Sequence, residues 1–250
     1  MKTVLRITLA LLILFAMQCI ASADASQLVK WSQLPDMVNG YQFSSETKVP
    51  SLVADDWICP TEALAGLRWW GGLWTPTAAG KYSHYCDSRP TITSLGNYQA
   101  WIIRIFDNVP QSATEPYARP GNELAMWTLS SADVQETHYK DTQSGRHVHS
   151  YYADLTNLAM PQLTAGSIYW ISIQAQMSDT NVQWGWHESR DHRLSAAVQD
   201  FKSAGWLQIQ NNMYDNDMAF ELTTIPEPTG LSVLTVGIGG MATFFWRRRR

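Results

Sequence analysis

The sequence lacks the short motifs that mark familiar catalytic sites. Its 250 residues contain no Gly-x-Ser-x-Gly nucleophile turn and no His-Glu-x-x-His pair, which removes the simplest hydrolase and metalloprotease interpretations. Three acids beside aromatic stretches, Glu62, Glu188 and Asp191, keep a glycosidase cleft as an alternative. No internal repeat or low-complexity segment precedes residue 226, so we expect one ordinary domain and no catalytic residues.

Cysteine is scarce, with three in the chain. One lies in the N-terminal apolar run, which leaves Cys59 and Cys86 in the body of the protein. In an oxidising compartment two cysteines favour a disulfide, here closing a loop of about 27 residues and contributing about 3 kcal/mol. Two free thiols are the alternative.

Basic residues are also scarce between the two ends. Of 18 Lys and Arg residues, two lie before residue 24 and four end the chain, which leaves 12 against 21 acidic residues in 24–225. This region therefore carries a net charge of −9 with histidine neutral. Such an acidic domain argues against nucleic acid and against anionic membrane surfaces as partners.

The first 23 residues have the three parts of a secretory signal peptide. Lys2 and Arg6 form a basic start, residues 7–20 are mostly apolar, and Ala21-Ser22-Ala23 supplies small residues before a cut. We therefore expect residues 1–23 to pass through the export machinery and to be removed by signal peptidase. The alternatives are an uncleaved anchor, although the run is short for a span of about 20 residues, and a lipid on the cysteine within it.

The C-terminal end is uncharged and then strongly basic. Residues 229–246 carry no charge over 18 positions, and Arg247, Arg248, Arg249 and Arg250 follow. As a helix the uncharged run would extend about 27 Å, close to the ~30 Å hydrocarbon layer. Four arginines would hold its end in the cytoplasm. We expect a transmembrane helix over 229–246 that leaves residues 24–225 outside.

Pro226-Glu227-Pro228 directly precedes this run. A Pro-Glu-Pro tripeptide, a short apolar span and a terminal arginine cluster, in this order, resemble a PEP-CTERM sorting signal, here over residues 226–250. The resemblance implies that Pro226, Glu227, Pro228 and the four arginines form the sorting motif. It also implies that an exosortase, a membrane protease of transpeptidase type found in exopolysaccharide-producing bacteria, processes the chain. A plain tail anchor is the alternative.

Strand patterns dominate the middle of the chain. In residues 167–175 apolar side chains alternate with polar ones, which is typical of a half-buried strand. Only residues 194–204 suggest a short helix. Many strands without crossover helices predict an all-β fold, an antiparallel, jelly-roll-like β-sandwich over 24–225. The expected strands are 52–58, 67–74, 98–106, 124–129, 148–155, 167–175, 181–186 and 217–222.

Three tetrapeptides of this middle region also resemble an uncharacterised β-sandwich family of exported bacterial proteins with such tails. They are Ala54-Asp55-Asp56-Trp57, Trp69-Trp70-Gly71-Gly72 and Asp217-Met218-Ala219-Phe220. The resemblance implies coverage of residues 33–222 and brings no known activity.

Tryptophan is abundant, with 12 in the chain. Neighbouring strand residues point to opposite faces, so one of Trp69 and Trp70 must point away from the core. An indole stacks well on the apolar face of a sugar ring. Trp69, Trp70, Trp74, Trp184 and Trp186 are therefore candidate polysaccharide-binding residues, with core packing as the alternative for each.

Aspartates lie at both ends of the predicted sandwich, where the first and last strands are often neighbours. Asp55, Asp56, Asp215 and Asp217 are therefore candidate ligands for a structural Ca²⁺, which needs six to eight oxygen atoms. Ordinary turn and strand-edge aspartates are the favoured alternative. We expect no other cofactor.

Histidines are a further candidate set. His147 and His149 share a face if their segment is extended, and His138 precedes them. A zinc site needs three or four ligands in a tight set, and no recognised spacing occurs, so packing or exposed histidines are the favoured interpretation. The other histidines are His84, His187 and His192.

These observations predict an exported, non-enzymatic protein held at the cell envelope or surface, or released to the extracellular matrix after tail processing. Exposed tryptophans would give it affinity for exopolysaccharide. A glycoside-active enzyme on the same scaffold and a purely structural matrix component are the competing hypotheses.

Overall fold

The computed structural model describes most of the central domain. Both predicted terminal signals, residues 1–23 and 226–250, lie outside the described residues. Within the described part, no helix has the length and apolarity needed to cross a bilayer. The described residues are 27–75, 91–92, 98–143, 145–178, 181–201, 204–211 and 214–225.

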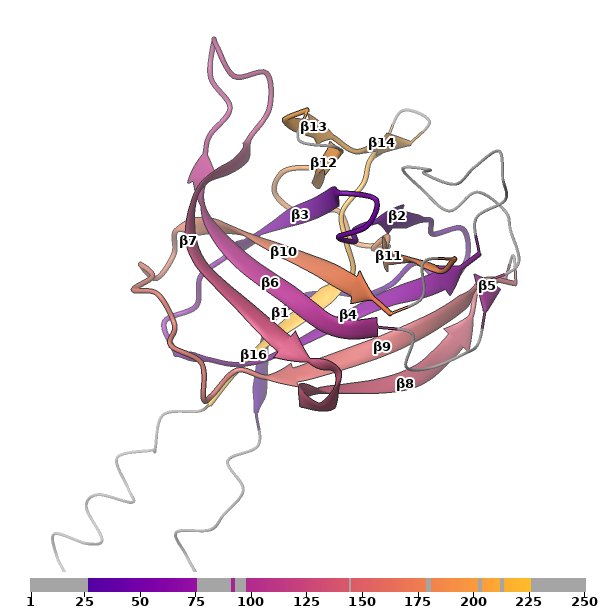
Figure 1. The fold of residues 1–250 in the computed structure, drawn as a ribbon. Coiled ribbons are helices and arrows are strands. Elements are labelled where there is room, and N and C mark those ends of the chain that lie inside the picture. Colours follow the sequence, from indigo (N-terminus) through magenta and orange to yellow (C-terminus); the bar gives the residue numbers. More distant parts are fainter. Residues whose placement is uncertain are drawn as a thin grey trace, which may run out of the picture. The chain divides into compact units, whose positions relative to one another are not determined.

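Residues 29–224 form one structural unit built from two large antiparallel sheets (Figure 1). The first sheet runs in the order β1-β16-β4-β11-β2, with β9 and β5 also paired to β4 and β8 paired to β9. Its strands are β1 (Leu28–Gln33), β2 (Gln42–Ser44), β4 (Leu64–Trp74), β5 (Thr91–Ile92), β8 (Val134–Asp141), β9 (His147–Asp154), β11 (Gln183–His187) and β16 (Phe220–Thr224).

The second sheet runs in the order β13-β12-β3-β10-β6-β7. A two-stranded ribbon, β14 (Gln210–Asn211) with β15 (Tyr214–Asp215), stands apart from it, and the turn η2 (Ser131–Asp133) links β7 to β8. The strands of this sheet are β3 (Ser51–Ile58), β6 (Tyr98–Val109), β7 (Arg119–Ser130), β10 (Ile168–Met177), β12 (Val198–Phe201) and β13 (Trp206–Gln208).

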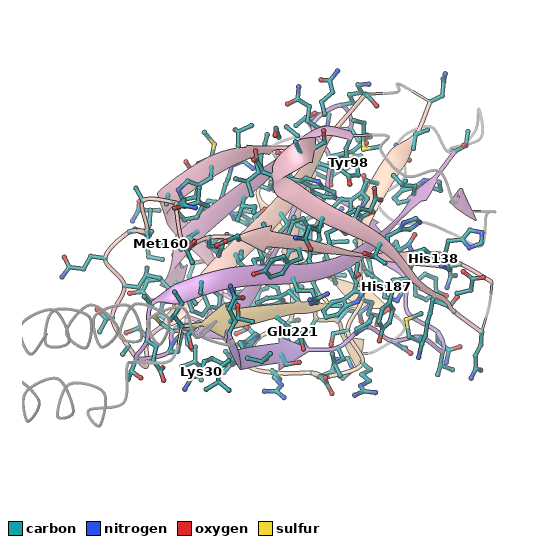
Figure 2. The ribbon with its side chains drawn as sticks, turned by 90° about the horizontal axis from the view of Figure 1, so that it is seen from below. Lys30, Tyr98, His138, Met160, His187 and Glu221 are labelled. Atoms are coloured by element: carbon teal, nitrogen blue, oxygen red, sulfur yellow. The ribbon has the colours of Figure 1, made fainter. Side chains whose placement is uncertain are left out.

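Alternation along the central strands explains why the two sheets pack face to face. On β10, Ile171, Ile173 and Ala175 point into the main apolar core, while Ser172 and Gln174 lie on the opposite face. Strands of both sheets supply this core, which fills the space between them (Figure 2). The predicted all-β fold with antiparallel sheets is confirmed, and the arrangement is consistent with the predicted sandwich.

Aromatic side chains form the centre of the core around Trp101 of β6. Its ring centroid lies 4.7 Å from those of Trp184 and Tyr151, 4.8 Å from that of Tyr98 and 5.1 Å from that of Trp69. Trp101 and Trp69 meet edge to face, one of the geometries that aromatic pairs prefer. Because these five residues come from both sheets, the cluster holds the sheets together.

Glycine is required at two points where a neighbouring side chain lies directly on the backbone of β4 or β11. A β-carbon at Gly72 would lie 2.0 Å from Nε2 of Gln42, and one at Gly185 would lie 2.7 Å from the ring of Trp74. Neither position tolerates a side chain without displacement of a neighbour. Gly185 therefore allows Trp74 to pack directly on the backbone of β11, and Gly72 makes room on β4 for the side chain of Gln42.

The helix predicted over 194–204 is wrong. Leu194 has a left-handed φ of +57°, Ala197 donates its N–H to the carbonyl of Asn216, and β12 then pairs with β3 from Val198 to Phe201. The sequence is compatible with a short helix, but pairing with β3 satisfies the same backbone groups and buries Val198. Tertiary pairing overrides local propensity here.

Candidate functional site

The five candidate tryptophans are buried, so the prediction that they form an exposed platform is wrong. Trp69, Trp74, Trp184 and Trp186 are at most 2% exposed. Trp70 does point away from the main core, as strand alternation requires, but Val148, Ala219, Leu34 and Met37 cover it in a second small cluster. The outer face of the first sheet is therefore covered around Trp70 by residues distant in sequence. The alternation of residues within β4 could not predict this cover.

Two of the candidate aspartates do meet, but not on neighbouring first and last strands as expected: Asp55 lies on β3 of the second sheet and Asp217 in the segment before β16 of the first. Nε2 of Gln33 donates to Oδ2 of Asp55 and to Oδ2 of Asp217, each at 3.2 Å. The orientation of the Gln33 amide follows from Trp31, whose indole N–H can only donate and is bonded to Oε1 of Gln33. Gln33 thus joins β1 to two buried carboxylates.

Backbone N–H groups complete this carboxylate pair. Asp55 accepts from the N–H of Met218 at 2.6 Å and from that of Asp56 at 2.8 Å, and Asp217 accepts from the N–H of Arg193. Burial, followed by the charge of Asp217, raises the pKa of Asp55 well above its ordinary value. The pair is a buried hydrogen-bonded junction between β1, β3 and the segment before β16.

The geometry does not favour the calcium hypothesis. Asp56 points away from Asp55, accepts from the N–H of Ser195 at 3.2 Å, and has its pKa raised to about 7 chiefly by burial. The side chain of Asp215 lies outside the described residues. The groups around Asp55 are N–H donors, whereas Ca²⁺ needs oxygen ligands. We therefore assign the pair a structural role.

The other predicted residues are dispersed. Glu62 forms an ion pair with Lys30, Glu188 accepts from the N–H of Tyr41 at 2.9 Å, and Asp191 accepts from the N–H of Leu34 at 3.1 Å. Each of these three acids is engaged with a different partner. Cys59, directly after β3, is buried and forms no disulfide within the described residues. Cys86 lies outside them, so the disulfide stays a prediction.

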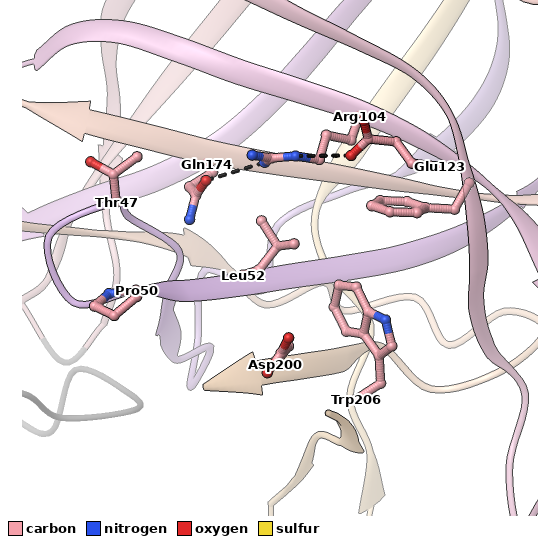
Figure 3. A pocket seen from close by; sticks show the side chains of 9 residues that line it. Thr47, Pro50, Leu52, Arg104, Glu123, Gln174, Asp200 and Trp206 are labelled. Carbon is pink, nitrogen blue, oxygen red and sulfur yellow. Dashed lines mark hydrogen bonds and ion pairs between the residues drawn. The ribbon is translucent and has the colours of Figure 1, made fainter. Parts of the chain in front are cut away.

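A groove of about 440 Å³ lies on the outer face of the second sheet (Figure 3). Its floor comes from neighbouring strands, with Leu52 on β3, Gln174 on β10 and Arg104 on β6. The volume lies in the range of small-ligand sites. The remaining lining residues are Thr47, Pro50, Phe106, Glu123, Asp200 and Trp206.

Aromatic rings form one wall of this groove. Trp206 on β13 is half-buried, and its ring meets Phe106 edge to face with centroids 5.9 Å apart. The hydroxyl of Tyr117 donates to the carbonyl of Trp206 at 2.6 Å, which fixes the backbone of this edge strand. An indole is thus held in place with part of its surface open to the groove.

Polar side chains form the opposite wall and the floor (Figure 3). Nη1 of Arg104 donates to Oε1 of Gln174 at 3.1 Å, and its Nε lies 3.4 Å from Oε2 of Glu123. Burial lowers the pKa of the Arg104 guanidinium, and the charge of Glu123 opposes this shift. Asp200 lies beside Trp206 and accepts from the N–H of Gly205 at 3.1 Å. The groove therefore offers planar donors and acceptors next to an aromatic ring.

Comparison with protein families assigns the domain. Residues 29–223, which coincide with the structural unit 29–224, match a domain of unknown function, DUF7901. The chain belongs to the DUF7901 family. No curated protein and no solved structure matches the chain. The groove is thus a feature of a DUF7901 domain, and its chemistry must be argued from its own residues.

Sequence reasoning missed the residues that line the groove of this DUF7901 domain. Trp206 follows a glycine in a short polar stretch, and Arg104 is the single basic residue within the apolar run 98–106. A charged residue in the middle of a central strand was the available signal, because such a side chain must find a partner or a solvent-facing recess. Without the strand order, Arg104 could not be connected with Glu123 or Trp206.

Proposed function

We propose that this protein is an exported, non-enzymatic component of the cell surface or extracellular matrix that binds polysaccharide in the groove beside Trp206. The proposal is supported by the groove, in which a half-buried tryptophan lies next to paired polar side chains. The open part of the half-buried Trp206 indole can stack on the apolar face of a sugar ring. The paired side chains of Arg104 and Gln174 supply donors and an acceptor for sugar hydroxyls.

The groove favours binding over cleavage. A glycosidase needs two carboxyl groups flanking the scissile bond, one of them a proton donor. Here Glu123 is ion-paired with Arg104, and Asp200 accepts from the N–H of Gly205, so both carboxyl groups are engaged as acceptors rather than placed as proton donors. These acids are placed as recognition groups. A purely structural matrix component would have no need of an open, half-buried tryptophan.

Export and sorting complete the proposal. The sequence pattern of residues 1–23 supports secretion, and the Pro-Glu-Pro tripeptide with the uncharged span and arginine end supports sorting by an exosortase-like enzyme at the envelope. In this arrangement the sandwich domain of jelly-roll type lies outside the cell, anchored by residues 229–246 or released after tail processing. Polysaccharide at the surface would then be its partner.

Replacement of Pro226, Glu227 and Pro228 by alanine is expected to leave export intact and to block tail processing. The physical reason is that the apolar span and its arginines still insert, while the tripeptide that the processing enzyme reads is gone. Intact-mass measurement of the envelope fraction checks this: the wild-type protein should lack its C-terminal segment and the variant should keep it. A wild-type chain of unshortened C-terminus would favour the plain anchor instead.

Trp206→Ala is expected to weaken retention on the exopolysaccharide of the producing bacterium by about tenfold, because loss of a stacked indole removes about 1.4 kcal/mol. Affinity electrophoresis of purified full-length protein in gels containing the polysaccharide measures this. Leu207→Ala is the matched control, since Leu207 is the next residue of β13, is 57% exposed and does not line the groove.

Equal retention of Trp206→Ala and the wild type would contradict the groove assignment. Trp206→Phe should recover part of the binding, because it keeps an aromatic face. Shortening of the polysaccharide during incubation, seen by size-exclusion chromatography, would instead support the glycoside-active alternative.

A further inference from the structure

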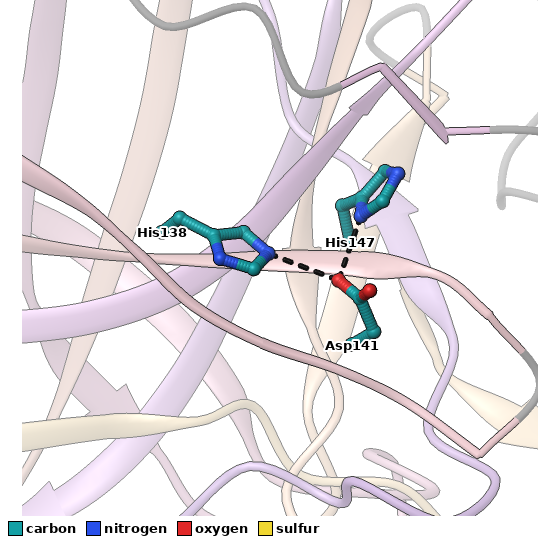
Figure 4. A group of neighbouring side chains, drawn as sticks. All are labelled: His138, Asp141 and His147. Atoms are coloured by element: carbon teal, nitrogen blue, oxygen red, sulfur yellow. Dashed lines mark hydrogen bonds and ion pairs between the residues drawn. The ribbon is translucent and has the colours of Figure 1, made fainter.

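A second group of polar side chains lies on the hairpin formed by β8 and β9, away from the groove. Nε2 of His138 and Nδ1 of His147 lie 2.9 Å and 2.7 Å from the same oxygen, Oδ1 of Asp141 (Figure 4). All three potential ligand atoms lie within 4.8 Å of one another. Among the described residues, no other three His, Cys, Asp or Glu side chains converge in this way.

A β-bulge brings these side chains together. His138 pairs with His149 and Lys140 with Val148, so Tyr139 is an extra residue in β8. In a regular strand, residues three apart such as His138 and Asp141 point to opposite faces. The extra residue places both side chains on the same face of the hairpin as His147, which pairs with Asp141 across the two strands. Bulges often change the direction of side chains in this way. The backbone therefore builds the cluster.

A buried imidazole lies directly behind it. His149 is fully buried, and neither of its ring nitrogens has a hydrogen-bond partner among the described residues. Its ring lies 5.6 Å from that of His138, centroid to centroid, and its Nδ1 lies 3.4 Å from Oε1 of Glu136. Buried polar rings without hydrogen bonds are rare in proteins. The inner side of the cluster is thus formed by the His149 ring, whose two nitrogens make no hydrogen bond within the described residues.

The outer side of the cluster is open. The side chains of His138 and Asp141 are 47% and 50% exposed, and that of His147 is 26% exposed. Figure 2 shows His138 at the edge of the domain, far from Lys30 at the other end. An ion from solution can therefore reach the three ligand atoms without any opening of the fold.

We propose that His138, Asp141 and His147 bind a divalent first-row transition metal of the zinc type. Imidazole and carboxylate ligands suit Zn²⁺, Ni²⁺, Co²⁺ and Cu²⁺, whereas Ca²⁺ and Mg²⁺ prefer oxygen alone. Zinc bonds to nitrogen and oxygen are about 2.0–2.2 Å long. Small rotations of the two imidazoles, which now share one carboxylate oxygen, would admit such an ion. Three protein ligands leave the remaining position to water.

This assignment does not depend on the polysaccharide groove. The hairpin belongs to the first sheet, whereas the groove lies on the outer face of the second. Variants of the cluster should leave retention on polysaccharide unchanged, so the two proposals can fail separately.

Metal binding is tested on untagged full-length protein by calorimetric titration with Zn²⁺ and by visible absorption with Co²⁺. We expect one ion per chain for the wild type, and an affinity at least about tenfold weaker for His138→Ala, His147→Ala and Asp141→Asn, since loss of a direct ligand costs at least as much as loss of an outer one. His192→Ala is the control, because His192 is exposed and outside the cluster.

Thermal unfolding separates metal binding from a structural role of the three side chains. Excess Zn²⁺ should raise the Tm of the wild type and of His192→Ala by the same amount, and should raise the Tm of His138→Ala and Asp141→Asn by clearly less. The proposal is overturned if Zn²⁺ does not bind the wild type, or if the three cluster variants bind it as tightly as the His192→Ala control does.

Discussion

Trp101→Ala is expected to lower the free energy of unfolding by about 3–5 kcal/mol, the range for truncation of a large buried aromatic residue. Trp101 is fully buried and meets four aromatic rings at centroid distances between 4.7 and 5.1 Å. Its removal leaves a cavity that rings from both sheets cannot close without moving off their preferred geometry.

Urea unfolding followed by circular dichroism measures this loss as a lower midpoint at unchanged slope. Trp206→Ala is the comparison, since the same side chain is removed from a half-buried position at the groove and should cost much less stability. A stability of Trp101→Ala within about 1 kcal/mol of the wild type would show that the core can collapse around the missing ring.

Asp55→Asn is expected to lower the free energy of unfolding by about 2–3 kcal/mol although the two side chains have the same shape. The carboxylate of Asp55 accepts from Gln33, Met218 and the N–H of Asp56. An asparagine has only one acceptor oxygen and presents its NH₂ group to one of these donors. At least one buried donor then loses its partner, at about 1–3 kcal/mol each.

The pH dependence gives this prediction a second readout. A carboxyl group whose pKa is raised in the folded state stabilises the protein fully below its unfolded pKa, and this stabilisation is lost as pH rises through the folded pKa. Since burial and Asp217 raise the pKa of Asp55, the destabilisation by Asp55→Asn should be larger at pH 5, just above the unfolded pKa of about 4, than at pH 8.

Asp154→Asn is the matched control for this measurement. Asp154 is exposed at the end of β9, and within the described part of the chain its side chain bonds only to the nearby Thr156, at 2.7 and 2.8 Å. Its replacement should change stability by less than about 0.5 kcal/mol at both pH values. If Asp55→Asn were as mild as this control, the buried junction would contribute little.

The strands of the core were predictable from sequence because burial forces a pattern on them. Segments such as 98–106 and 167–175 alternate or are continuously apolar, and they became β6 and β10. The meeting of Asp55 and Asp217 was expected from neighbouring first and last strands, but it arises between the two sheets, since Asp55 lies on β3 of the second sheet and Asp217 before β16 of the first. The N–H groups that surround the two carboxylates could not be predicted. Gln33 donates to both aspartates, and no rule of sequence spacing connects it to either of them.

The edge of the first sheet was not predictable in the same way. Strand β8 consists mostly of polar residues that face solvent, so its pattern resembles a loop. The bulge at Tyr139 is decided by pairing with β9, and it is this bulge that gathers the histidines. The burial of Trp70 was likewise not predictable, because Leu34 and Met37, which cover it, are distant in sequence.

Strand β16, the last of the domain, lies between β1 and β4 rather than at an edge. It is paired along its length with β4 from Phe220 to Thr224, and Ser32 of β1 bonds to Glu221 from the other side. A mechanical pull applied beyond Thr224 would therefore load the hydrogen bonds of two ladders together in shear, where an edge strand would peel off one bond at a time. We therefore expect a higher force to be needed to unfold this domain from its C-terminal end than if β16 were an edge strand.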